Sequence, residues 1–289
     1  MERRLLSETP ACQIVRLQIG DTPVAVVDTP GLDDTKRSDT EILDEITQFL
    51  ATQYSLGIPL KGVIYLHRIT DNKMQGNALR YFRMFQKLCG DQALGNVVLV
   101  TTMWDQLKNS AIGLQRDQQL RDEFWNLMAA KGSHITSFDG SPEMAETIVW
   151  RLMRKSSVVL DIQREVVDEG RRLDETSAGR VIAPAVDDRL RKDGEEIARL
   201  DRCIASVDLN MVGRKELERQ RGRMIAQRQR DASERDRLRA NIGKEVSVKV
   251  ERAKKGSVWK DAVTTFASVL GLSISVVTNL ILPLCGVGF

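Results

Sequence analysis

Short apolar runs rich in valine and isoleucine alternate with longer amphipathic stretches over about the first 155 residues. The β-branched runs predict buried strands, and apolar residues spaced three and four apart predict helices that pack on them. The predicted strands are residues 14–19, 24–27, 63–66, 97–100 and 134–138. The predicted helices are residues 39–52, 75–88, 115–131 and 142–155. This alternation is typical of an α/β layered sheet, which is the expected fold class.

Gly20 and Asp21 lie between the first two predicted strands and supply a tight turn, so these strands should form an antiparallel hairpin. The later strands are separated by stretches long enough for helical crossovers. Ser141 stands before Pro142 in the manner of an N-cap, which predicts a helix start at that point.

A second zone, residues 156–255, is dominated by charged residues of both signs and has few strand signals. Two series of apolar residues recur there at heptad positions. The first is Leu190, Ile197, Ile204 and Met211, and the second is Val186, Leu200 and Val207, interrupted by Asp193. Farther along, Asp231 falls on the same seam. The pattern predicts a modest coiled coil or a helical hairpin, and a solvated single helix is the alternative.

The third zone, residues 256–289, contains no charged residue from Ala262 to Phe289. Its length suits one membrane span, and Lys254, Lys255 and Lys260 supply a basic flank. Seven polar residues and Pro283 dilute this signal. Contact with a membrane through residues 262–289 therefore stands beside two alternatives, a helix buried against protein and an interfacial segment.

Composition narrows the function classes. The net charge of +3 predicts no particular partner, and the arginines between Arg214 and Arg239 alternate with acids and lack aromatic neighbours, which argues against nucleic-acid binding. Four scattered cysteines and two histidines form no zinc-ligand spacing. No apolar stretch follows Met1 in the manner of a secretory signal, so the expected localisation is cytoplasmic.

Two strand ends carry candidate chemistry. The run from Val24 to Val27 ends in Asp28, and Gly31 follows three residues later. A carboxylate at a strand end can hold Mg²⁺, and a glycine N–H can approach a terminal phosphate. The run from Val97 to Val100 leads to Thr102 and Asp105, which match the T-x-x-D form of the guanine-reading [NT]-K-x-D motif. A buried Asp105 would distinguish guanine from adenine, because adenine lacks the matching pair of donors.

With these motifs in order, residues 7–153 resemble the P-loop GTPases, specifically the septin-like and immunity-associated branch and its fungal G-domain-containing proteins. The resemblance implies GTP and Mg²⁺ as ligands and a three-layer sheet domain. It implies metal ligation by Thr9 and Asp28, a γ-phosphate contact from Gly31, and guanine contacts from Thr102 and Asp105. Ser137 and Phe138 fall where the family has a further base-contacting loop.

Three departures from the family pattern matter. Leu32 replaces the glutamine that orients water, so any hydrolysis would be slow or assisted. Met103 replaces a lysine whose stem would cover the base. The sequence contains no G-x-x-x-x-G-K-[ST] loop, and the strand before that loop would be the central strand of the sheet. We therefore expect a gap between the strands ending at Asp28 and Leu66, as in an N-terminally truncated GTPase. The alternative is a degenerate pseudo-GTPase in which the neighbouring strands close the gap.

The sequence thus predicts an incomplete P-loop GTPase domain over residues 1–155, followed by a helical arm and a hydrophobic C-terminal segment. The predicted function is that of a GTP-binding switch, with the arm serving homo-oligomer formation. The alternative is a nucleotide-free pseudo-GTPase that acts as an interaction or membrane-tethering protein.

Overall fold

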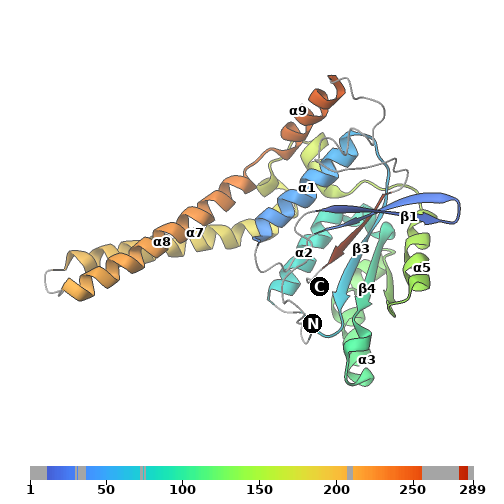
Figure 1. The fold of residues 1–289 in the computed structure, drawn as a ribbon, viewed down its shortest axis with the longest axis horizontal. Helices are drawn as coiled ribbons and strands as arrows, with labels where there is room; N and C mark the ends of the chain where they lie inside the picture. The colour runs from blue at the N-terminus through green and yellow to red at the C-terminus, as the bar shows by residue number, and fades with distance from the viewer. Residues whose placement is uncertain are drawn as a thin grey trace.

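The computed structural model describes residues 12–29, 31, 37–71, 74, 76–206, 211–255 and 280–285 (Figure 1). Its strands are β1 Gln13–Ile19, β2 Thr22–Asp28, β3 Leu60–Arg68, β4 Val97–Thr102, β5 His134–Ser137 and β6 Leu280–Cys285. Its α-helices are α1 Asp39–Ser55, α2 Asn77–Cys89, α3 Ser110–Gln119, α4 Asn126–Ala130, α5 Pro142–Met153, α6 Asp161–Gln163, α7 Gly179–Ala205, α8 Met211–Leu238 and α9 Ile242–Lys255. The strands form one mixed sheet in the order β1-β2-β6-β3-β4-β5.

The α/β class is confirmed, and so is the N-terminal hairpin. Strands β1 and β2 pair antiparallel from Gln13 with Asp28 to Ile19 with Thr22, around a turn in which Gly20 has a positive φ of 56°. The remaining pairs in the sheet are parallel. Ser141 caps α5 through its side chain, as expected.

The prediction of one continuous helix over residues 115–131 is wrong. The segment is divided into α3, a π turn over Leu120–Phe124 and α4. The π turn closes with a hydrogen bond from the Trp125 N–H to the Leu120 carbonyl, 2.8 Å long. The extra residue turns the fully buried Trp125 ring edge-on against Tyr65 and His67, so core packing explains the break.

Two apolar clusters lie on opposite faces of the sheet. On one face α1 and α2 bury residues such as Leu43 and Phe82 around Tyr65 of β3. On the other face, α5 buries Ile148 and Leu152 against β3 and β4. Figure 1 shows α5 separated by the sheet from α1 and α2. The sheet is therefore a middle layer between helices.

The gap expected between β2 and β3 is filled, so that prediction is wrong. Strand β6 lies between them, parallel to both, and pairs with β3 from Leu280 opposite Leu60 to Cys285 opposite Leu66. Its ladder with β2 covers only Ala25 and Val26 and stops before Pro283. Proline has no backbone N–H to give to a ladder, which is consistent with the short pairing on that side. Backbone groups of β3 that a gap would leave unpaired thus have partners.

Within the segment 262–289 predicted to contact a membrane, residues 280–285 form this strand, and the others lie outside the described residues. Among the helices that the structure describes, none combines the length and the hydropathy that a bilayer crossing requires.

Helices α7 and α8 form a long hairpin that projects from the layered body (Figure 1). The hairpin alternative is therefore the one found, with the two paired helices in the same chain. The seam is formed by the second predicted series as far as Leu200, since Val186, Asp193 and Leu200 are buried in α7; Val207 lies outside the described residues. The first series is only partly buried, and Met211 does not belong to it, because it begins α8 and is exposed.

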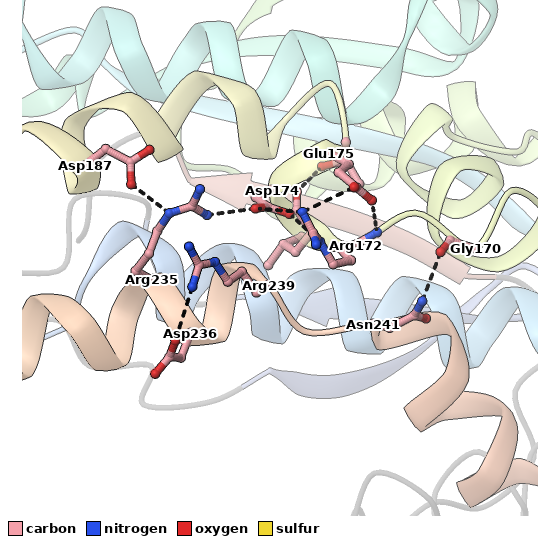
Figure 2. Close-up of polar contacts among 11 residues, drawn as sticks. Gly170, Arg172, Asp174, Glu175, Asp187, Arg235, Asp236, Arg239 and Asn241 are labelled. Carbon is pink, nitrogen blue, oxygen red and sulfur yellow. Dashed lines mark hydrogen bonds and ion pairs between the residues drawn. The ribbon is translucent and has the colours of Figure 1, made fainter.

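A network of charged residues fastens the base of this hairpin to the body (Figure 2). Arg235 of α8 lies between Asp187 of α7 and Asp174 of the preceding loop, at 2.7 and 2.8 Å. Arg172 contacts Asp174 at 3.1 Å from the other side, and Asn241 donates to the Gly170 carbonyl at 2.9 Å. The connections before α7 and after α8 are thereby held together.

Candidate ligand-binding site

A cavity of about 380 Å³ lies between the sheet and α5, at the carboxyl ends of the parallel strands. Its walls come from β2, β3, β4, α5 and the loops after β4 and β5. The lining residues are Val26, Ile64, Leu66, Val100, Thr102, Met103, Asp105, Phe138, Asp139, Gly140, Ala145, Ile148 and Val149. Three predicted site residues thus line one cavity: Thr102 at the end of β4, and Asp105 and Phe138 from two separate loops. The carboxyl edge of an open α/β sheet is a common place for ligands.

Hydrogen bonds fix the segments that carry these residues. The Phe138 N–H donates to the Thr101 carbonyl at 2.8 Å, which ties the loop after β5 to the end of β4. The Trp104 indole N–H donates to the Thr101 carbonyl and hydroxyl at 3.2 and 3.1 Å. The buried Thr102 hydroxyl donates to the His67 carbonyl at 3.4 Å. The positions of Thr102 and Phe138 therefore follow from β4 and its neighbours.

Met103 adopts a left-handed backbone conformation with φ 61° and ψ 33°. Among the described residues it is the one non-glycine residue with a positive φ. Such a conformation costs on the order of 1 kcal/mol for a residue with a Cβ. It turns the chain sharply between Thr102 and Asp105 in the wall of the cavity. Backbone strain is thus located at the candidate site.

The walls of the cavity are mostly aliphatic, and its polar groups gather at the rim. Asp105 is exposed, so the burial expected for it is not present in the ligand-free chain. Asp139 faces the same cavity, and hydrogen bonds from the Ser141 hydroxyl and N–H hold the pKa of that carboxyl below its usual range. The arrangement suits a flat ligand with an apolar body and an edge of N–H donors.

Of the other predicted site residues, some lie at the carboxyl edge of the sheet near the cavity and the others do not. Asp28 is the last residue of β2 and Gly31 is buried just beyond it, while Val26 of the same strand lines the cavity. Ser137 is exposed at the end of β5 and does not line the cavity. Thr9 and Leu32 lie outside the described residues.

Sequence reasoning missed Asp139 and the contribution of α5 to the walls. The residues from Asp139 to Pro142 indicate a helix start, and that pattern alone does not show that Asp139 faces a cavity. Nothing in the spacing of Ala145, Ile148 and Val149 distinguishes a cavity wall from a packed core face.

His67 lies in β3, the strand whose Ile64 and Leu66 line the cavity, but its side chain has another role. Its ring is buried on the opposite face, edge-on to Trp125, and its Nδ1 has no hydrogen-bond partner. Burial lowers the pKa of His67, so the imidazole is neutral in the folded chain. His67 therefore acts as a core residue, and only its carbonyl reaches a site residue, Thr102.

No known protein-family model matches the chain, and no curated protein sequence matches it.

Proposed function

We propose that this protein binds a guanine nucleotide, with the base in the cavity between the sheet and α5. The observation that carries the proposal is the convergence of Thr102, Asp105 and Phe138 on that cavity. These residues belong to two segments that lie some distance apart in the chain, and a common cavity is what a shared ligand requires.

The chemistry of the rim favours guanine over adenine. Guanine presents its ring N–H and its exocyclic amine along one edge, and a carboxylate can accept both hydrogen bonds. Asp105 and Asp139 are carboxylates at the rim, and the aliphatic walls would cover the faces of the ring. Because Asp105 is exposed in the free chain, its selectivity depends on the ligand covering it, so that the wrong base leaves it desolvated and unpaired.

Asp28 and Gly31 would face the phosphate end of the nucleotide. Mg²⁺ is commonly held by one or two carboxylates together with substrate phosphates, and a single Asp28 fits that arrangement. Among the described residues, no group of three acidic, histidine or cysteine side chains could hold a metal ion without the nucleotide. The ion would neutralise phosphate charge. Leu32 offers no group to orient water, so the proposal concerns binding, with hydrolysis slow at most.

The second candidate function is a nucleotide-free interaction protein in which the sheet serves as a scaffold for the helical arm. Two observations favour it. The sequence contains no G-x-x-x-x-G-K-[ST] loop, which supplies most phosphate contacts in nucleotide-binding proteins of this kind. The cavity walls are also largely aliphatic and would accept an apolar side chain of a partner as well as a base.

Fluorescent analogues of GTP and ATP, titrated into the full chain with and without Mg²⁺, separate the two functions. We expect the chain to bind GTP, and Asp105→Ala to weaken this binding by roughly tenfold or more, which is the usual contribution of a charged hydrogen bond to affinity. Ala145→Phe, which fills the cavity, should abolish binding. Glu146→Ala is the matched control, because Glu146 is exposed on α5 and does not line the cavity.

Absence of binding to a chain with a native circular dichroism spectrum would refute the nucleotide proposal and favour the scaffold. Equal binding of GTP and ATP, unaffected by Asp105→Ala, would show that the base lies elsewhere.

A further inference from the structure

The free end of the hairpin carries an unusual apolar pair. Met211 and Val212 begin α8 and are 89% and 80% exposed, the highest values among the large apolar side chains that the structure describes. Neighbouring positions on a helix point about 100° apart, so packing against α7 alone could not bury both. Single exposed apolar residues are common on protein surfaces, but two adjacent ones at the end of a projecting element indicate a contact surface.

The helix behind this pair is strongly basic. From Met211 to Arg230, α8 has seven lysines and arginines, and its acidic residues there are Glu216 and Glu218. Arg219 pairs with Glu216 at 2.9 Å and Arg221 pairs with Asp201 of α7 at 2.5 Å. The other five basic residues leave a positive surplus on this half of the helix.

The hairpin holds this end away from the body. Helix α8 has 28 residues, which corresponds to about 40 Å. Its base is fixed by the Arg235 network, whereas its far end lies beside α7 and, among the described elements, away from the sheet (Figure 1). The apolar pair and the basic surplus are thus presented together, at a distance from the sheet and its cavity.

We propose that the end of the hairpin docks on an anionic lipid surface. Met211 and Val212 would insert among the acyl chains near the headgroups, and the basic residues of α8 would lie against the anionic lipids. Two observations favour a bilayer over a nucleic acid. The apolar pair would gain no favourable contact with a phosphate backbone, and the sequence from Met211 to Arg230 contains no aromatic residue for base stacking. This proposal is independent of nucleotide binding.

Sedimentation of the full chain with vesicles tests the proposal. Phosphatidylcholine vesicles containing phosphatidylserine should bind the protein, and pure phosphatidylcholine vesicles should not. Met211→Asp/Val212→Asp should lower partitioning at least tenfold, and Arg214→Glu/Lys215→Glu should lower it by a similar factor, since each basic residue at an anionic surface contributes roughly fivefold. Higher ionic strength should weaken the binding.

Leu114→Asp is the matched control. Leu114 is 64% exposed on α3, far along the chain from the hairpin, and its substitution should leave partitioning unchanged. Circular dichroism should show the same helix content for all variants, because every substituted side chain is at the surface.

Three outcomes would overturn the proposal. Vesicle binding that survives Met211→Asp/Val212→Asp would place the lipid contact elsewhere. If the full chain does not bind anionic vesicles and instead binds duplex RNA through the same basic residues, the surface is a nucleic-acid-binding site. If it does not bind vesicles, and Met211→Asp/Val212→Asp converts a dimer to a monomer in size-exclusion chromatography, the surface binds a second copy of the chain.

Discussion

Replacing Arg189 with methionine should destabilise the hairpin, because Arg189 is the counter-charge of a buried carboxylate. Arg189 of α7 contacts Asp231 of α8 at 3.0 Å and Glu234 at 2.6 Å, and Asp231 is only 2% exposed. Asp193 of α7 is also buried at this seam, and burial together with the nearby Asp231 raises its pKa. The two acids that interrupt the apolar heptads therefore face each other, with Arg189 paired to Asp231 and with Arg228 also near Asp193.

The size of the effect follows from this geometry. Two unit charges about 4 Å apart attract by about 4 kcal/mol at an effective dielectric constant of 20. The Arg189 side chain is 41% exposed, so solvent screening reduces this to about 2 kcal/mol. A loss of about 2 kcal/mol corresponds to a fall in Tm of about 4–8 °C in a chain of this size.

The pH dependence has a definite sign. Without Arg189, the pKa of Asp193, which burial and the neighbouring Asp231 already raise, should rise further, because one of the two arginines that lower it is lost. A folded-state pKa above the unfolded value means that protonation favours the folded chain. The loss of unfolding free energy caused by Arg189→Met should therefore become smaller as the pH falls from 7 toward the ordinary pKa range of aspartic acid.

Urea unfolding of the full chain, followed by helical circular dichroism at two pH values, measures this effect. Arg191→Met is the control, because Arg191 pairs with Asp188 and Glu195 on the exposed side of α7 and should cost about 0.5 kcal/mol or less. Adding Asp231→Leu to Arg189→Met should recover most of the loss. Equal costs for Arg189→Met and Arg191→Met, or no recovery in the double variant, would refute the reasoning.

Three further predictions concern other parts of the fold. Gly243→Ala should destabilise the chain by about 2 kcal/mol or more, since its Cβ would lie 1.9 Å from the Val166 carbonyl oxygen; Gly222→Ala, in open space on α8, should stabilise it by about 0.5–1 kcal/mol in the same urea titration. Because burial lowers the pKa of His67, the unfolded chain takes up a proton first below about pH 6.5; His67→Phe should therefore lose less stability than the native chain between pH 7 and 5.5. Arg235→Met should increase amide exchange at the base of the hairpin, where Asp174 and Asp187 lose their shared partner (Figure 2), and unchanged exchange there would contradict the network.

Local patterns predicted most of the sheet and the cavity loops. The alternation around Gly20 was enough for the β1–β2 hairpin, because a tight turn and two β-branched runs leave few other pairings. Thr102 was identified from its motif at a strand end, whereas Phe138 was assigned to a base-contacting loop only through the family resemblance; both line one cavity because the carboxyl ends of parallel strands meet at one edge. The hairpin and the motif at the end of β4 thus need only local sequence, and the Phe138 assignment needs the resemblance as well.

The failures concern interactions between distant parts of the chain. The π turn before Trp125 depends on how that ring fits against Tyr65, which no helical period encodes. Strand β6 was missed because an uncharged stretch containing Pro283 suits a membrane segment better than a central strand. Asp193 and Asp231 were recorded as breaks in a heptad, and only the structure shows Arg189 beside them.

The central position of β6 has a consequence for biosynthesis. Leu280 pairs with Leu60, so the ladder in the middle of the sheet joins residues about 220 positions apart. A ribosome that adds about 5–20 residues per second needs about 10–40 s to reach β6 after β3 has been made. During that interval the inner edges of β2 and β3 lack the strand that separates them in the finished sheet. Until β6 is made, these two strand edges are therefore open to premature pairing with other strands.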